Sequence, residues 1–174
     1  LKVAALATCA ATIMAVLAAM SVSRVSTASA RMLESAFLAP LIFPMLSYGL
    51  AVLMFFSLLG YRPSLILLII GHVVVIAPFI FRTTLASLTL EGSLLECSAS
   101  LGAGRFYTFR RVTLPIILPG VAAGAFLAFV ASLDNVPVSL FLTNARTDML
   151  PIRMWGMIES TLDVRVAAIS GVLI

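Results

Sequence analysis

Side chains able to do acid–base, nucleophilic or metal chemistry are few in this sequence and lie far apart. The 174 residues include a single histidine, His72, a single lysine, Lys2, and two cysteines, Cys9 and Cys97. A metal site needs three or four ligands close together, and a glycine-rich phosphate loop needs a lysine after its last glycine. Neither pattern is present, so the sequence predicts no metal site, no cofactor and no ATP hydrolysis within this chain.

One stretch, residues 91–120, combines charge, glycine and proline within an otherwise apolar sequence. It carries Glu96 in a helix-like segment, then a pair of glycines that includes Gly102, then three arginines, and it closes on Leu114–Pro115 and a second proline. Loops of this length without a role are uncommon, and this one holds too many apolar residues to be disordered. It is either an amphipathic helix lying on a membrane or a docking element for a partner, and the residue pattern favours docking.

The composition is that of an integral membrane protein. Hydrophobic residues make up 62% of the chain, charged residues make up 10%, and the mean hydropathy is +1.19. Long apolar runs cross a bilayer as helices, because a helix pairs its own backbone polar groups. The net charge of +4 is spread among these runs, which argues against nucleic-acid binding, and the two separated cysteines predict no disulfide framework.

Four apolar runs are long enough to be complete membrane spans, and a fifth begins after Arg165. The four expected spans cover residues 3–22, 37–59, 64–81 and 116–136. The second contains Pro40 and Pro44, so its first half is expected to be kinked or to start late. The fourth carries Gly120 and Gly124 four residues apart, a spacing typical of tight helix packing. Residues 1–174 are therefore interpreted as one all-α, polytopic membrane domain.

The loops between the expected spans fall into two alternating sets. One set, which includes loops 23–35 and 82–115, holds six basic residues, and the other holds five. Because basic loops are retained on the cytoplasmic side, loops 23–35 and 82–115 are expected to be cytoplasmic and residues 137–163 periplasmic. Within this last segment, Pro151 can start a short helix that places Trp155 at the membrane–water interface.

The stretch at residues 91–120 resembles the loop through which permease subunits of ABC importers contact their ATPases. In that family a glutamate is followed by two small residues, a glycine stands six positions after the glutamate, and the loop ends on an aliphatic-x-Leu-Pro sequence. The corresponding residues here are Glu96, Cys97, Ser98, Gly102, Leu114 and Pro115. Cysteine and serine replace the two alanines of the family pattern. The resemblance implies that these six residues form a cytoplasmic ATPase-coupling site.

Two further segments, residues 132–142 and residues 150–155 followed by 166–169, resemble the spermidine/putrescine branch of that permease family. The resemblance implies a pore-forming, MetI-like permease domain in the bacterial inner membrane. It implies as partners a second permease subunit, a separate ABC ATPase subunit, a periplasmic substrate-binding protein and membrane lipid. It also implies a polyamine or similar organic cation as substrate, while related branches carry iron, thiamine, phosphonates or opines. Such subunits have six spans, so the sequence is expected to be cut at both ends, with one span missing before Leu1.

Three polar residues in or beside the expected spans have two interpretations each. Asp134 and Asn135, at the end of the fourth span, either cap the turn into Pro137 or line the substrate path and face a cation. His72, inside the third span, either hydrogen-bonds a neighbouring helix or marks a functional site, because polar groups are costly within a membrane. For His72 we prefer the hydrogen bond.

Two other functional classes compete with a permease subunit. A proton-driven secondary transporter needs ionisable residues at mid-membrane, and His72 is the one residue that meets this description. An intramembrane enzyme such as a protease needs a nucleophile, a base and an acid close together, and no such set can be assembled around one histidine. The sequence therefore favours a transporter subunit that is not itself an enzyme.

Overall fold

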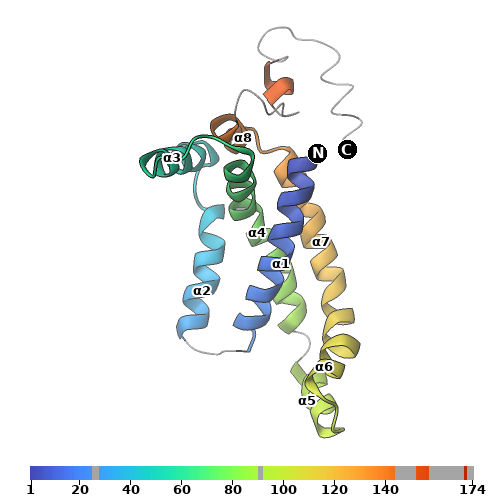
Figure 1. The fold of residues 1–174 in the computed structure, drawn as a ribbon. Coiled ribbons are helices and arrows are strands. Elements are labelled where there is room, and N and C mark those ends of the chain that lie inside the picture. The colour runs from blue at the N-terminus through green and yellow to red at the C-terminus, as the bar shows by residue number, and fades with distance from the viewer. Residues whose placement is uncertain (25–27, 90–91, 144–151, 157–170, 172–174) are drawn as a thin grey trace.

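Helices account for the regular structure that the computed structural model describes. The described residues are 1–24, 28–89, 92–143, 152–156 and 171. Three long helices lie side by side and form the body of the molecule (Figure 1): α1 (Lys2–Val22), α4 (Leu65–Thr89) and α7 (Leu114–Leu133). The all-α architecture expected from the sequence is confirmed.

The packing of α1 against α4 depends on a stripe of alanines. Ala7, Ala11, Ala15 and Ala19 recur at every fourth position of α1 and are completely buried. Residues four apart share one face of a helix, and this face lies on α4 in the most extensive helix contact of the described part. Small side chains let the two backbones approach closely, which increases dispersion contacts where no water is present to drive hydrophobic packing.

α7 packs on α4 through two glycines, Gly120 and Gly124. A Cβ atom on Gly124 would lie 2.8 Å from the Cα atom of Ile80, and one on Gly120 would lie 2.8 Å from the carbonyl oxygen of Thr83. Both obstacles are backbone atoms, so a larger residue at either position would have to push the helices apart. The tight-packing face predicted at Gly120 and Gly124 is confirmed.

The second expected span is broken rather than straight. α2 (Ala28–Leu38) continues into a 3₁₀ turn, η1 (Ala39–Leu41), and the chain then bends by 105° into α3 (Met45–Leu58). Pro40 lies in the 3₁₀ turn and Pro44 directly precedes α3, where a missing N–H disturbs no helical hydrogen bond. The expected kink is confirmed, and because the two prolines turn α3 across the end of the bundle, residues 37–59 do not form one continuous helix.

Three helix ends differ from the sequence prediction. α2 begins at Ala28, inside the segment expected to be a loop at 23–35. α4 continues to Thr89 rather than ending at residue 81, so Arg82 lies exposed on the helix. α7 ends at Leu133 rather than at residue 136. Hydropathy marks where apolar side chains stop, whereas a helix ends where its backbone hydrogen bonds end. α2 and α4 therefore extend into polar sequence, and α7 stops early because Asn135 starts a new helix, α8.

A last short helix, α8 (Val136–Leu142), packs against α3 and α4. By length and apolarity, three described helices can cross a bilayer, or four if α2 and α3 together count as one span. The expected start of a fifth span after Arg165 lies outside the described residues. Residues 152–156 are helical with Trp155 half exposed, which agrees with a short helix after Pro151.

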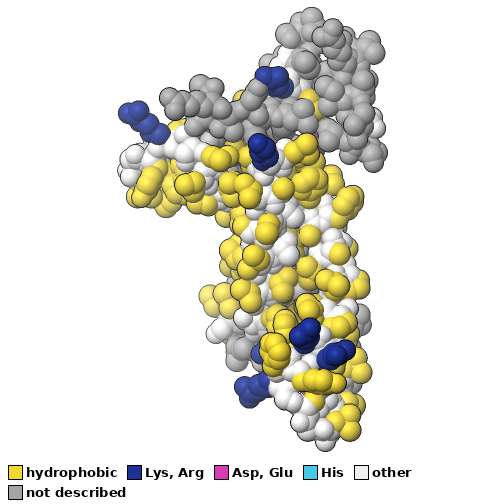
Figure 2. Space-filling view, turned by 45° about the vertical axis from the view of Figure 1, so that its right-hand side comes forward, with side chains coloured by type: hydrophobic (Ala, Val, Ile, Leu, Met, Phe, Trp, Pro, Cys, Tyr) yellow, Lys and Arg dark blue, Asp and Glu magenta, His cyan; other side chains and the backbone are white. Residues whose placement is uncertain are grey.

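The remaining elements gather at the two ends of the bundle. α5 (Gly92–Ser100) and α6 (Arg105–Thr108) form what we call the inner end, while α3, α8 and the amino terminus lie at the opposite, outer end (Figure 1). The carboxyl end of α1 and the amino end of α2 lie toward the inner end, on the same side as α5 and α6. Figure 2 shows lysine and arginine side chains at both ends and a mostly hydrophobic, uncharged surface between them, as a membrane-spanning belt requires.

The glycine contact between α7 and α4 can be tested with Gly124→Val. The new side chain would meet the backbone of α4, so we expect the free energy of unfolding to fall by about 1–3 kcal/mol. The measurement is the thermal midpoint of the detergent-solubilised full-length protein. Ala123→Val adds the same kind of bulk one position away on an exposed face and should leave the midpoint unchanged. Equal midpoints for the two variants would contradict close packing at Gly124.

Candidate functional site

The inner end is a helical hairpin of α5 and α6 whose turn depends on Gly102. The N–H of Gly102 donates to the carbonyl oxygen of Ala99 (2.9 Å), and the N–H of Ala103 donates to that of Ser98 (3.1 Å). This pair of bonds is a Schellman motif, which places the residue after the helix in the left-handed region. Gly102 has a φ of 75°, a conformation that glycine adopts without strain. The predicted backbone turn at Gly102 is therefore confirmed.

A pair of hydroxyl groups closes the hairpin. Ser98 Oγ and Thr108 Oγ1 lie 2.7 Å apart, and Ser98 is buried between α5 and α6. The neighbouring Cys97 is exposed. The two small residues of the sequence pattern therefore differ in role. Ser98 lets the two helices approach closely and hydrogen-bonds across them, whereas Cys97 is an exposed small side chain that leaves the surface of α5 without bulk.

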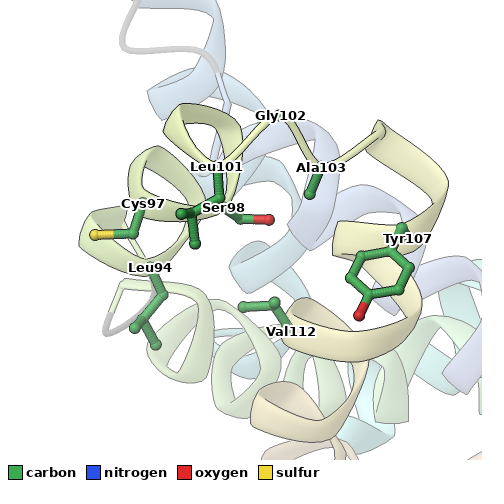
Figure 3. A pocket seen from close by; sticks show the side chains of 8 residues that line it. All are labelled: Leu94, Cys97, Ser98, Leu101, Gly102, Ala103, Tyr107 and Val112. Atoms are coloured by element: carbon green, nitrogen blue, oxygen red, sulfur yellow. The ribbon is translucent and has the colours of Figure 1, made fainter.

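A groove of about 610 Å³ lies between the two arms of the hairpin (Figure 3). Leu94 of α5 and Leu101, which directly follows α5, stand on one side of it, and Tyr107 and Val112 stand on the other, with the Cys97 thiol at the rim. The residues that line it are Leu94, Cys97, Ser98, Leu101, Gly102, Ala103, Tyr107 and Val112. Most of these side chains are apolar, so the groove suits an apolar side chain of another protein.

The structure brings together three of the six residues expected in the coupling site. Cys97, Ser98 and Gly102 line the groove, whereas Glu96 is exposed on α5 outside its lining. Leu114 and Pro115 are exposed at the first turn of α7 and do not reach the groove. The pattern of sequence positions thus describes the hairpin and its exit into α7 rather than a single cluster of side chains.

Five residues that line the groove were not among the expected coupling residues: Leu94, Leu101, Ala103, Tyr107 and Val112. Leu101 is 87% exposed and Tyr107 is 61% exposed, although both are large and apolar or aromatic. Leu94 lies in α5 and Leu101 directly follows it, seven residues later, so a search for helical periodicity would have found this pair. Val112 is the aliphatic residue of the aliphatic-x-Leu-Pro ending, but that pattern does not predict its place in the groove, which depends on how the chain enters α7.

The hairpin joins α7 through η2 (Phe109–Thr113), a π-helix. π-helical turns are rare and often occur at functional sites, because the extra residue widens the turn. Arg110 and Arg111 on this segment are exposed, while Thr113 is buried. α6, η2 and α7 form one unbroken helical path from Arg105 to Leu133, so the hairpin is connected to α7 without a flexible linker.

At the outer end, Asp134 and Asn135 separate α7 from α8. The Asn135 side chain accepts a hydrogen bond from the backbone N–H of Val138 (3.1 Å), and Asn135 is 7% exposed. Asn135 is therefore the N-cap of α8, which confirms the capping interpretation for this residue. Asp134 ends α7 and is exposed. The side chain of Asp134 makes no hydrogen bond to the described residues, so it takes no part in the cap of α8.

His72 hydrogen-bonds neighbouring helices, as we preferred from the sequence. Its Nδ1 atom lies 2.8 Å from Ser132 Oγ on α7, and its Nε2 atom lies 3.2 Å from Ser139 Oγ on α8. The ring is completely buried. Both ring nitrogens thus have hydroxyl partners, which offsets the cost of burying a polar side chain.

Within the described part of the chain, no three histidine, cysteine, aspartate or glutamate residues lie close enough to hold a metal ion. The polar groups that the structure does bring together are hydroxyls, one imidazole and helix caps. These groups position helices and leave an apolar groove open to a partner.

Comparison with known proteins places this arrangement in a family. Residues 8–174 match the family described as the binding-protein-dependent transport system inner membrane component. The spermidine/putrescine transport system permease protein PotC of Escherichia coli (strain K12) is 31% identical over 132 residues, which cover 75% of this chain and 50% of that protein. The putrescine transport system permease protein PotI of the same strain is 25% identical over 143 residues, covering 78% and 51%.

A relative with a different printed substrate is also similar. The Fe(3+)-transport system permease protein FbpB 2 of Haemophilus influenzae is 39% identical over 103 residues, covering 55% of this chain and 20% of that protein. The chain spans about half the length of the polyamine permeases that it matches. Because the family match includes the hairpin and every described helix except the start of α1, the chain belongs to the inner-membrane components of binding-protein-dependent transport systems, as a multi-pass membrane protein.

Proposed function

We propose that this chain is the pore-forming permease subunit of an ATP-driven importer. It would pass a small organic cation of the polyamine class from a periplasmic binding protein across the inner membrane. The observation that supports this most strongly is the inner-end hairpin. It presents an open apolar groove, built around the left-handed turn at Gly102, at the place where the sequence resembles an ATPase-coupling loop.

The surface of the hairpin suits a protein partner. Leu101 is 87% exposed, Phe106 is 77% exposed and Tyr107 is 61% exposed, and monomers rarely leave such side chains in water. Glu96 and Arg105 are exposed close to them in the sequence and add charge beside the apolar side chains. An apolar centre with a polar rim is the usual anatomy of a protein interface. We assign the ATPase subunit to this surface.

The membrane-facing surface accommodates the other partners. α7 exposes Phe126, Leu127 and Val130, and the outer faces of α1 and α3 are also rich in exposed apolar side chains. Exposed apolar side chains at the level of a membrane contact lipid or another membrane helix. A second permease subunit would complete the pore along part of this surface, and lipid would cover the rest.

ATP-driven movement would reach the pore through α7. Closure of two ATPase subunits would move the docked hairpin, and the hairpin is continuous with α7 through η2. A rigid helix carries such a movement to its far end, where it can open or close access to the outside. ATP binding and hydrolysis belong to the partner subunits in this proposal.

The choice of a polyamine rests on the names of two relatives and on one exposed carboxylate. PotC and PotI are both named as polyamine permeases. Asp134 lies exposed at the outer end, where a cargo would arrive. An exposed carboxylate attracts a cation by about 1 kcal/mol or less once solvent screening is included, which biases a path without binding tightly. Iron is the second candidate, favoured by the similarity to FbpB 2.

The docking assignment predicts the effect of two substitutions in the hairpin. Glu96→Lys reverses an exposed charge beside the groove, and Gly102→Val places a β-branched residue at a φ of 75°, which strains the Schellman turn. Each change should weaken co-purification of the ATPase by roughly tenfold while the protein still inserts in the membrane. Gly104→Val is the matched control, because Gly104 has a φ of −67° and open space around it. Normal transport and co-purification in both variants would refute the docking assignment.

The orientation of the chain predicts which positions an impermeant thiol reagent can reach in intact cells. In a background with Cys9→Ala and Cys97→Ala, Thr147→Cys should be labelled from outside, although Thr147 lies outside the described residues. Ser29→Cys and Ser93→Cys should be labelled after permeabilisation alone. Labelling of Ser93→Cys in intact cells would place the hairpin on the wrong side of the membrane for an ATPase.

The cationic substrate predicts a kinetic effect for Asp134→Asn, which keeps the shape of the side chain and removes its charge. We expect the KM for polyamine uptake to rise roughly two- to fivefold, consistent with a contribution of about 1 kcal/mol or less, while basal ATPase activity and complex assembly stay unchanged. Asp134→Glu should behave like the unaltered protein. Unchanged uptake kinetics in Asp134→Asn would remove the residue-level support for a cation.

A further inference from the structure

Three buried polar side chains meet where α4, α7 and α8 converge at the outer end. They are His72, Ser132 and Ser139, with exposed fractions of 0%, 1% and 0%. The imidazole lies 2.8 Å from the first hydroxyl and 3.2 Å from the second. In a neutral imidazole one nitrogen donates and the other accepts, and a hydroxyl can take either complementary role, so both bonds can form at once.

The other contacts that hold α8 in place are apolar and depend on a close fit of the helices. A Cβ atom on Gly71 of α4 would lie 3.1 Å from Val138 Cγ1, and one on Gly49 of α3 would lie 2.9 Å from Phe141 Cδ2. Val138 is completely buried. Apolar contacts of this kind hold α8 close but tolerate small sliding, whereas the bonds from His72 are directional and fix one position.

Ser132 and Ser139 differ from other helical serines of this chain in where their hydroxyls bond. Ser21, Ser87 and Ser100 each donate to the carbonyl oxygen four residues earlier in the same helix, at 2.8, 3.1 and 2.9 Å. Ser132 and Ser139 pair with His72 instead. A helical serine that loses its partner can turn back to that carbonyl oxygen. If α8 separates, both hydroxyls can therefore re-pair, and the imidazole is the group that loses its partners.

We propose that His72 is a positioning residue that latches α8 to the outer ends of α4 and α7, and that this latch opens when the transport path opens outward. A neutral hydrogen bond adds little net stability, so two of them can hold a closed state and still release it. Asp134 ends α7 and Asn135 caps α8, so these two residues join the helices that the latch holds together. The role in opening rests on the proposed transport function, whereas the closed latch rests on the geometry alone.

The latch is tested by the reactivity of a buried position on α8, measured in the full-length protein in its native membrane with Cys9→Ala and Cys97→Ala. Val138→Cys should react slowly with a small water-soluble thiol reagent. Adding His72→Phe, which keeps a ring but removes both bonds, should raise the labelling rate roughly tenfold. Ser139→Ala should raise the rate as well and should add nothing to His72→Phe, because the same bond is already absent.

Two controls separate a local latch from general support of the fold. Thr84 is also completely buried on α4, and its hydroxyl has no partner among the described residues, so Thr84→Val should leave the reactivity of Val138→Cys unchanged. Ala77→Cys, at a buried position where α4 packs on α1, reports on the bundle itself. It should stay protected when His72→Phe is added.

Unchanged reactivity of Val138→Cys in the His72→Phe protein would overturn the latch. An equal rise at Ala77→Cys would overturn it too, because His72 would then support the whole bundle. Labelling needs neither ATPase nor substrate, so both results leave the proposed transport function standing. That function fails separately if the hairpin variants keep normal ATPase binding and uptake.

Discussion

The close contact of α7 with α4 at Gly120 and Gly124 is the constraint on which both ends of the molecule depend. α7 begins at the hairpin and ends beside α8, so its position sets where the groove and the buried His72 cluster can form. The glycine backbone of α7 meets both backbone atoms and the Thr83 and Ser87 hydroxyls of α4, and α4 is fixed in turn by the alanine stripe of α1. Dispersion between closely spaced helices therefore supplies most of the stabilisation, and a few hydrogen bonds fix the position of one helix along another.

The features that sequence predicted correctly are those set by neighbouring residues. Apolar runs mark membrane helices, two prolines four residues apart mark the break before α3, and a glycine after α5 marks a left-handed turn. Each of these signals acts through the backbone within one or two helical turns. The small residue at Ser98 belongs to the same group, because it lies where α5 and α6 approach closely; the coupling of this hairpin to an ATPase stays a proposal.

The features that sequence missed depend on residues far apart in the chain. The partners of His72 lie 60 and 67 residues away, and nothing local distinguishes Ser132 or Ser139 from other serines. The course of α3 across the outer end needs α8 to pack on Gly49, and Tyr48 adds a hydrogen bond to the carbonyl oxygen of Gly71 on α4 (3.3 Å). Such contacts follow from how helices dock, which periodicity within one segment does not encode.

The shared use of α7 offers a physical link between the two ends. The helical path from Arg105 to Leu133 has 29 residues, about 43 Å at 1.5 Å per residue. It begins with α6 and continues through the π-helix η2, whose turn is wider than that of an α-helix. At its far end Ser132 bonds His72, and a hydrogen bond weakens steeply when its geometry is lost. A small rotation of α7 that starts at the hairpin would therefore keep or break the hydrogen bond between Ser132 and His72. Coupling of this kind needs one rigid element that has two arrangements. It does not need a continuous chain of specific contacts between the hairpin and the buried His72 cluster.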